Sequence, residues 1–382
     1  MEDGLALSLR SKTAATRAPR FATAPAWMRA RRLTPLTHSW DELEVFAPAP
    51  RSRPLRAFLL RCGSLEANGR RTLVSIRLVD DGLAWPISFD ARYGVGYRRS
   101  LVLGGGGIVF VAWLAAYLGE LASRGIAVDE ADRIVGTSAG AMLAGVVAEG
   151  HLGRFGRLLR LLARRPALIG RLAPAGGLKA SQQRGRDLFE RAQDAEPATI
   201  RAIGAGALAA ATPSANLLPT SVLLMLQTWR WPDDRLVVTA VDAYTGERLA
   251  LTRASGVPLL RAVAASASVP GLFAPQPLLE RRCMDGGVSG TGIHADLVAG
   301  AGRALVFPIA DTLPEPRLTI RPDSTDRELA ALRAAGTDVA VRHSRLPATT
   351  NLMDPAEVPA ALALGAHQAG EDAGALADFW RD

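Results

Sequence analysis

The sequence predicts an α/β fold built around a mainly parallel sheet. The apolar run 100–103 enters four consecutive glycines and continues as a mostly apolar helix over 108–118. The run 134–135 likewise passes through a tight glycine turn into a helix of small residues that extends to Glu149. A third stretch, 235–242, has the same mostly apolar character. Short runs without alternation are typical of parallel strands that are buried on both faces by flanking helices.

The second of these turns, 136–140, has the Gly-x-Ser-x-Gly pattern of a nucleophile elbow. In such an elbow the strand-to-helix turn is so tight that the residues beside the nucleophile must be small, which leaves the serine hydroxyl exposed at a helix N-terminus. Gly136 and Gly140 meet this demand on either side of Ser138. The same pattern also occurs in ordinary glycine turns with a serine cap, so the surrounding sequence has to decide.

The glycine run 104–107 offers several backbone N–H groups at the start of a helix. Such groups can hold a phosphate or the oxyanion of an acyl-transfer intermediate, and glycines alone do not distinguish the two. A dinucleotide site has the pattern G-x-G-x-x-G and an acidic residue about twenty positions later. Glu120 and Asp129 lie near that distance, but Phe110 occupies the place of the last glycine, and there is no Gly-Lys-Ser/Thr ending of a Walker loop. A nucleotide-binding α/β protein therefore stays open as an alternative.

Two more motifs follow the elbow. The segment 265–273 reads Ala-Ser-x-x-x-Pro-x-x-Phe, and Asp285, Gly286 and Gly287 come shortly after it. A glycine loop, an elbow about thirty residues later, this segment and an Asp-Gly-Gly, in that order, resemble the patatin-like phospholipase family over about residues 98–310. The order of the motifs is far more specific than any one of them.

The resemblance implies a three-layer α/β/α sandwich and a serine hydrolase that cleaves acyl esters of lipids, of the phospholipase A or lysophospholipase type. It implies a dyad of Ser138 as nucleophile and Asp285 as general base, with no histidine, no metal and no cofactor. It also assigns Gly105, Gly106 and Gly107 to an oxyanion loop that binds substrate, and Gly136, Gly140, Gly286 and Gly287 to the motifs around the dyad.

The residues themselves are compatible with such a dyad. A serine hydroxyl is a weak nucleophile until a neighbouring base accepts its proton, and a carboxylate can do so if burial raises its pKa toward neutrality. Asp285 lies between apolar residues and two glycines, which favours burial. A histidine triad stays open as an alternative, because His294, His343 and His367 all follow the serine.

Two positions depart from the resemblance. The family's loop commonly reads Gly-Gly-Gly-x-Arg-Gly, whereas this chain has Val109 and Phe110 in the last two places. The missing arginine removes a positive charge near the developing oxyanion, and phenylalanine in place of glycine stiffens the loop. A catalytically weak or inactive relative that binds a lipid or a protein partner is therefore a further alternative.

The charge and the cysteine content limit the kinds of partner and compartment to be expected. The chain carries a formal net charge of +8, and residues 1–40 hold seven basic and two acidic residues of this balance. Nearly all basic residues are arginine, and no zinc spacing, RNA-binding signature or basic patch interleaved with aromatics supports a nucleic-acid partner. Cys62 and Cys283 follow no metal or redox spacing, so a reducing compartment, the cytoplasm, is the simplest expectation.

Two parts of the chain are expected, an N-terminal extension over 1–97 and a hydrolase domain over 98–382. Residues 1–32 are rich in Ala, Arg, Thr and Ser, have no continuous apolar segment of the kind a secretory signal needs, and are predicted to be disordered. Further along the extension, the runs 55–60 and 72–79 are predicted to form the strands of a small hairpin.

Within the hydrolase domain, residues 151–165 predict a basic amphipathic helix. Such a helix either covers the core or lies at an anionic lipid surface, so peripheral membrane contact is one expectation for it. Residues 166–235 are predicted to form a cap inserted between nucleophile and base, interrupted by prolines and not a transmembrane span. The run 305–309 is predicted as the final strand, followed by helices over 323–346 and 355–380.

Overall fold

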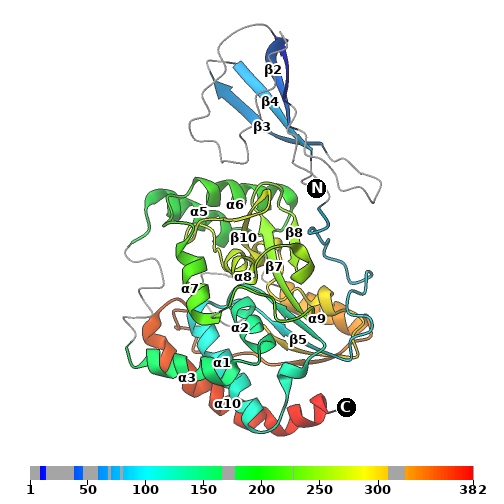
Figure 1. Cartoon of the computed structure of the whole chain (residues 1–382), viewed down its shortest axis with the longest axis vertical. Coiled ribbons are helices and arrows are strands. Elements are labelled where there is room, and N and C mark those ends of the chain that lie inside the picture. The colour runs from blue at the N-terminus through cyan, green and yellow to red at the C-terminus, as the bar shows by residue number, and fades with distance from the viewer. Residues whose placement is uncertain are drawn as a thin grey trace. The chain divides into compact units, whose positions relative to one another are not determined.

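The computed structural model describes the backbone of four strands within residues 1–80, and both backbone and side chains over 81–165, 177–226, 228–308 and 323–381. The chain divides into two compact units, Met1–Ala84 and Trp85–Asp382 (Figure 1). The glycine loop, the elbow and the Asp-Gly-Gly segment all belong to the second unit.

The first unit contains β1 (Leu9–Thr13), β2 (His38–Val45), β3 (Leu59–Ala67) and β4 (Arg70–Arg77). They form one sheet in the order β1-β2-β4-β3. β3 and β4 pair antiparallel, with Leu59 opposite Arg77, close to where the sequence predicts a hairpin. Most of the stretch 1–32 that is predicted to be disordered lies outside the described residues.

The second unit is built on one eight-stranded sheet. Its strands are β5 (Arg99–Leu103), β6 (Arg133–Gly136), β7 (Leu236–Asp242), β8 (Arg248–Leu251), β9 (Gln276–Leu278), β10 (Arg281–Asp285), β11 (Arg303–Phe307) and β12 (Asp338–Val341). The order is β12-β11-β5-β6-β7-β10-β9, with β8 also paired to β7. Strands from β12 to β7 run parallel to their neighbours, whereas β8 and β10 run antiparallel to β7. The predicted mainly parallel sheet is therefore confirmed.

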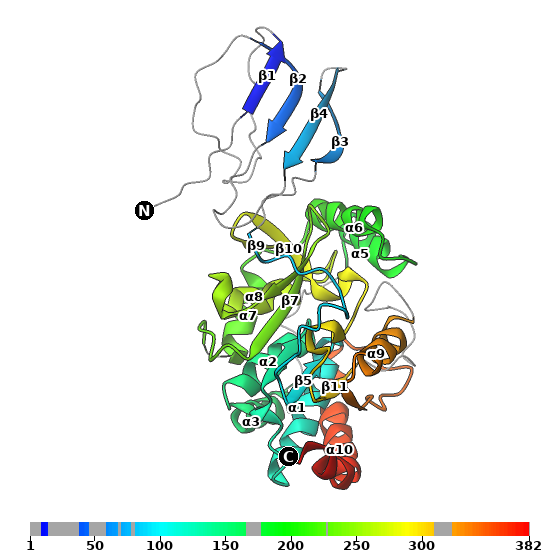
Figure 2. The same cartoon turned by 90° about the vertical axis from the view of Figure 1, so that its right-hand side faces the viewer.

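Helices flank this sheet on both faces. They are α1 (Gly107–Ser123), α2 (Ala139–Ala148), α3 (Leu152–Ala163), α5 (Ala180–Glu190), α6 (Pro197–Ala209), α7 (Leu217–Leu226), α8 (Leu259–Ser266), α9 (Ser324–Ala334) and α10 (Val358–Trp380). β5 leads into α1 and β6 into α2, as the sequence predicts. Figure 2 shows α9 on the side of the sheet away from α2 and α3.

The two faces of the sheet have separate cores. On one face, Leu329 and Leu332 of α9 join a buried cluster that includes Val306 of β11. The next residue, Phe307, points to the opposite face because side chains alternate along a strand. There it meets Trp113 of α1, with ring centroids 6.1 Å apart. The second unit is thus the three-layer α/β/α sandwich that the resemblance implies.

Residues before the first strand of this sheet also pack on it. Trp85, Phe89 and Tyr93 lie against the α9 side of the core. Arg248 of β8 donates a 2.8 Å hydrogen bond to the Trp85 carbonyl oxygen. Residues 85–97, which the sequence grouped with the extension, are therefore part of the second unit.

Two predictions for the C-terminal part of the chain are wrong. The strand at 305–309 is not the last, because β12 pairs with β11 beyond it, with Val339 opposite Ala304. The predicted helix over 323–346 ends at Ala334, where Gly336 at φ 88° takes a left-handed conformation that stops a helix. The residues after it include β-branched valines, which favour a strand. The last predicted helix, 355–380, is confirmed as α10 after one 3₁₀ turn at Pro355–Glu357.

Helices α5, α6 and α7 occupy the region that the sequence predicts as a cap. Residues 166–176 and 227 of that region lie outside the described residues. Among the helices that the structure describes, none is both long and apolar enough to cross a membrane.

Helix α1, which starts at the glycine loop, packs closely against α10. Trp113 Nε1 donates a 2.7 Å hydrogen bond to Gln368 Oε1, and the Tyr117 hydroxyl donates one of 2.5 Å to Asp372. Gly365 permits this approach, because a Cβ there would lie 2.1 Å from the Trp113 carbonyl oxygen. The helix that carries the loop is therefore positioned by direct backbone contact.

Replacing Gly365 by alanine should lower the free energy of unfolding by about 1–3 kcal/mol, because the added methyl group must push α1 and α10 apart. Gly374→Ala is the matched control on the same helix, since no atom lies within 4 Å of where its Cβ would be. It should leave the free energy of unfolding unchanged or raise it by up to ~1 kcal/mol. Urea unfolding measures both variants, and equal stabilities would contradict this packing.

Candidate active site

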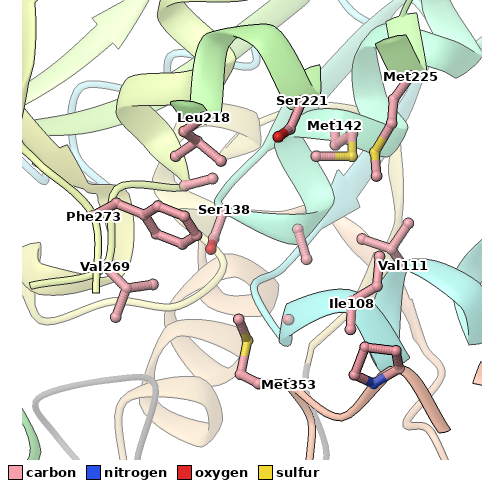
Figure 3. Close-up of a pocket in the computed structure, with 14 residues that line it drawn as sticks. Ile108, Val111, Ser138, Met142, Leu218, Ser221, Met225, Val269, Phe273 and Met353 are labelled. Atoms are coloured by element: carbon pink, nitrogen blue, oxygen red, sulfur yellow. The ribbon is translucent and has the colours of Figure 1, made fainter. Parts of the chain in front are cut away.

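Ser138 stands in the turn between β6 and α2. Its backbone has φ 54° and ψ −119°, a strained conformation for a residue with a side chain. A Cβ at Gly140 would lie 2.0 Å from the Leu103 carbonyl oxygen, and one at Gly136 would lie 2.6 Å from the Cα of Ala141. Both glycines of the pattern are therefore sterically required. The turn leaves Ser138 half-buried at the wall of a pocket (Figure 3).

Asp285 ends β10, which is separated from β6 by β7 alone. Ser138 Oγ donates a 2.7 Å hydrogen bond to Asp285 Oδ2. The other carboxylate oxygen, Oδ1, accepts a 2.9 Å hydrogen bond from the Gly287 N–H. The structure thus brings together the two residues that the sequence pairs, although 147 positions separate them in the chain. Their catalytic roles stay predictions.

Burial dominates the electrostatics of Asp285, which is 4% exposed. Burial raises the pKa of Asp285 to about 7 because the charged carboxylate loses its hydration, and the hydrogen bonds from Ser138 and Gly287 oppose this rise. A carboxyl group with a pKa near neutrality can accept and return a proton at neutral pH.

Two serines of the Ala-Ser segment accept hydrogen bonds from the backbone N–H groups of Ser138 and Asp285. Ser266 Oγ accepts a 2.9 Å hydrogen bond from the Ser138 N–H. The Ser268 carbonyl oxygen accepts a 3.0 Å hydrogen bond from the Asp285 N–H. The sequence reasoning assigned no role to either serine, and their only signal was the place of the segment between the two other motifs.

The predicted oxyanion loop lies against Ser138. A Cβ at Gly105 would be 3.3 Å from Ser138 Cβ and 3.9 Å from its Oγ, so the loop backbone passes directly beside this hydroxyl. Gly107 has φ 64°, a left-handed conformation that glycine adopts readily. At the end of the loop the Val109 N–H donates a 3.1 Å hydrogen bond to the Leu352 carbonyl oxygen, which makes it unavailable to a substrate.

The two residues that depart from the family's loop are buried in α1. Val109 and Phe110 are both 0% exposed, and neither lines the pocket. Phe110 stacks on Trp113 with ring centroids 5.4 Å apart. A Cβ at Gly106 would lie 2.4 Å from Phe110 Cβ, so glycine is needed where the loop crosses this ring. Phe110 therefore packs against the loop at Gly106 without lining the pocket.

An apolar pocket opens beside Ser138 and encloses about 800 Å³ of empty space, including the part open to solvent. Among the described residues that line it, none has a charged side chain, and Ser138 and Ser221 supply hydroxyl groups. Figure 3 shows side chains from several elements around it, among them Val111, Met142, Met225, Phe273 and Met353. This lining suits a flexible hydrocarbon chain, since methionine adapts to irregular apolar shapes.

Two of the elements that build the pocket could not be assigned from the motifs. Leu218, Ser221 and Met225 come from α7, inside the region predicted as a cap. Met353 and Pro355 come from the segment before α10, beyond the stretch that resembles the family. Only the folding of α10 against α1 brings that segment to the site, and no local pattern signals it.

The histidines do not form a triad with the serine. His294 Nε2 lies 3.2 Å from the Gly286 carbonyl oxygen, and His367 Nε2 lies 3.3 Å from Glu371 Oε1. His343 lies after β12. In the described part of the chain, the nucleophile candidate hydrogen bonds with a carboxylate and a serine and with none of these histidines.

Cys283 is 0% exposed in β10, as expected of a small apolar core residue. The side chain of Cys62 is not among those described. Over the described ranges, no group of three or more His, Cys, Asp or Glu side chains is placed to hold a metal ion.

The solved structures that resemble this chain include two of low sequence identity. VipD from Legionella pneumophila is 14% identical, with a TM-score of 0.38, and the match covers 85% of this chain and 71% of that chain. The type III effector protein ExoU is 16% identical, with a TM-score of 0.31, and the match covers 76% of this chain and 55% of that chain. Neither likeness is close enough to support an inference about activity. No curated protein matches the chain.

A family model gives a more specific result. The model described as patatin-like phospholipase matches residues 101–297. This match spans more than half of the 382 residues and contains the glycine loop, the elbow, the Ala-Ser segment and the Asp-Gly-Gly. The chain therefore belongs to the patatin-like phospholipase family.

Proposed function

We propose that this protein is a serine hydrolase that cleaves acyl esters of lipids with a Ser138–Asp285 dyad. The observation that carries the proposal is the 2.7 Å hydrogen bond from Ser138 Oγ to Asp285 Oδ2 at the wall of an uncharged, apolar pocket. A hydroxyl in this position has a base within reach of its proton and room for an ester beside it.

The reaction proceeds by acyl transfer in two halves. As Ser138 Oγ bonds to the ester carbonyl carbon, its proton passes to Asp285 Oδ2. The carbonyl oxygen becomes an oxyanion that the backbone amides of the loop Gly105, Gly106 and Gly107 stabilise. The bond from carbon to the leaving alcohol then breaks, and the alcohol oxygen takes the proton from Asp285. Water attacks the acyl-enzyme in the same way, which releases the carboxylic acid and restores Ser138.

The pocket supports an acyl chain as the part of the substrate that is held. Met142 and Met225 line it on one side of Ser138, and Met353 lines it on another. An apolar, uncharged lining favours hydrocarbon and excludes a charged head group, which would lose its hydration there. The head group of a phospholipid or lysophospholipid therefore stays outside, on the alcohol side of the scissile bond.

Ser138→Ala and Asp285→Asn should each lower esterase activity at least about 10³-fold, because the nucleophile or its base is lost. Ser123→Ala, at the exposed end of α1, is the matched control and should keep wild-type activity. Hydrolysis of a short-chain nitrophenyl ester measures the rates, and a fluorophosphonate probe should label the wild type and Ser123→Ala but not Ser138→Ala. A wild-type protein that neither hydrolyses the ester nor reacts with the probe would instead be a lipid-binding member of the family.

The rate of fluorophosphonate labelling should depend on pH through Asp285. Its pKa is raised from the ordinary value to about 7, and only the ionised form accepts the serine proton, so the rate should fall as pH drops below 7 and level off above it. Glu328 is a second buried carboxyl group with a pKa of about 7. Glu328→Gln should therefore keep this pH dependence, and a rate that stays constant down to about pH 5 would exclude Asp285 as the base.

We also propose that α3 contacts anionic lipid at a membrane surface. The buried side of this helix, with Phe155 and Leu159, packs on the core. The exposed side presents Arg157 and Arg160, and beside them Leu161 is 62% exposed. The segment 151–165 contains no acidic residue, so its positive charge is complementary to anionic head groups. A location in the cytoplasm stays a prediction.

The double variant Arg157→Glu/Arg160→Glu should bind vesicles of phosphatidylglycerol and phosphatidylcholine at least about tenfold more weakly than the wild type, because each arginine near an anionic surface contributes ~1 kcal/mol. Arg253→Glu/Arg333→Glu carries the same charge change at two exposed arginines elsewhere and is the matched control. Vesicle sedimentation measures both. Equal losses in the two double variants would show a general charge effect and no docking by α3.

A further inference from the structure

The peptide group between Gly286 and Gly287 joins the Asp285 carboxylate to a buried polar cluster. On one side its N–H donates the 2.9 Å hydrogen bond to Asp285 Oδ1. On the other side its carbonyl oxygen accepts a 2.9 Å hydrogen bond from the Ser289 hydroxyl and lies 3.2 Å from His294 Nε2. Both lone pairs of this oxygen thus have a polar partner on the side away from Asp285.

Arg248 decides which nitrogen of His294 carries the proton. Arg248 Nη1 lies 3.4 Å from His294 Nδ1, and a guanidinium can only donate hydrogen bonds. Nδ1 must therefore be the acceptor, which leaves the proton on Nε2, where it points at the Gly286 carbonyl oxygen. The pKa of His294 is lowered well below its ordinary value, first by burial and then by the charge of Arg248, so the ring stays neutral at neutral pH.

The surroundings fix this ring in place. Arg248 makes two hydrogen bonds to Asp296, of 2.6 and 2.8 Å, and both residues are buried. Glu328 from α9 accepts a 2.9 Å hydrogen bond from the Ala295 N–H. His294 is 0% exposed and has φ 53°, an unfavourable conformation for a residue with a side chain. A strained backbone held by a buried network indicates a function for the position beyond packing.

We propose that His294 is a positioning residue that, through the Gly286–Gly287 peptide, aims an N–H at Asp285 and stabilises the ionised form of that carboxylate. A hydrogen bond accepted by a peptide carbonyl polarises the peptide and strengthens the bond that its N–H donates. The chain of contacts runs from Arg248 to His294, then to the peptide and then to Asp285. Its consequence for catalysis rests on the proposed function, whereas its effect on the carboxylate does not.

The size of the effect follows from hydrogen-bond cooperativity. One partner strengthens the next bond by roughly 10–30%, so losing the His294 contact should raise the pKa of Asp285 by about half a unit. Arg248 faces the His294 ring, Asp296 pairs with Arg248, and Glu328 binds the N–H of the next residue, Ala295. Glu328 has its own pKa of about 7, so a measurement must separate it from Asp285. Arg281, at the start of the strand that ends at Asp285, forms a 3.0 Å ion pair with Asp242 of β7.

NMR titration of the full chain with ¹³C-labelled aspartate carboxyl groups makes this separation, since glutamate stays unlabelled. The Asp285 signal is identified by its loss in Asp285→Asn. We expect the wild-type signal to titrate near pH 7 and that of His294→Leu about half a pH unit higher. Ser289→Ala, which removes the other donor to the same oxygen, should also shift the titration upward. His294→Gln restores both a donor and an acceptor and should titrate within ~0.2 pH units of the wild type.

Gln368→Leu is the control for general loss of stability, because it removes a buried polar side chain that contacts Trp113 and not Asp285. It should leave the Asp285 titration unchanged. Unshifted titrations in folded His294→Leu and Ser289→Ala would overturn the proposal.

Should His294→Leu fail to fold, ¹⁵N imidazole shifts of the wild type still decide, with His294→Gln assigning the signal. A proton on Nδ1, or a ring that titrates between pH 5.5 and 9, would overturn the proposal. The Asp285 titration could shift as expected between the wild type and His294→Leu while no fluorophosphonate labels the wild type. That result would refute the proposed function and leave this inference standing.

Discussion

The hydrogen bond between Ser138 and Asp285 depends on the pairing and register of the strands that carry the two residues. β6 pairs parallel with β7, which places Gly136 opposite Val238. β7 pairs antiparallel with β10, which places Asp285 opposite Ala240. The end of β6 and the end of β10 therefore lie at nearly the same level of β7, one on either side of it. A one-residue slip in either register would send a side chain to the wrong face and separate the pair.

Burial and steric crowding then turn this meeting into a chemically defined site. The elbow can be this tight only because Gly136 and Gly140 have no Cβ, and a Cβ at Gly105 in the loop would make a close contact of 3.3 Å with Ser138 Cβ. The same crowding removes water from Asp285, which moves its pKa toward neutrality. A carboxylate in open water would be a much weaker base, so the close packing that the glycines permit also supports the proposed chemistry.

Patterns within a few neighbouring residues were enough to predict some parts of this arrangement. The buried strands and the elbow follow from apolar runs and glycine spacing within a few residues. The order of the motifs indicated a resemblance to the family, and that resemblance paired Ser138 with Asp285. Met353 reaches the pocket only through the packing of α10 on α1, which has no local signature. The four residues of β12 include two valines, a weak local signal for a strand, and their pairing with β11 exists only in three dimensions. No pattern in the sequence indicated that His294 lies beside Gly286, because that contact exists only in three dimensions.

The central claim is that Ser138 attacks a carbonyl whose oxygen lies at the glycine loop while the acyl chain fills the apolar pocket. A crystal structure of the protein after reaction with a long-chain alkyl fluorophosphonate tests all three parts at once. The account predicts phosphorus bonded to Ser138 Oγ, the phosphoryl oxygen within hydrogen-bonding distance of the Gly105, Gly106 or Gly107 amides, and the alkyl chain along Met142 and Met225. An adduct on another residue, or a phosphoryl oxygen turned away from the loop, would contradict it.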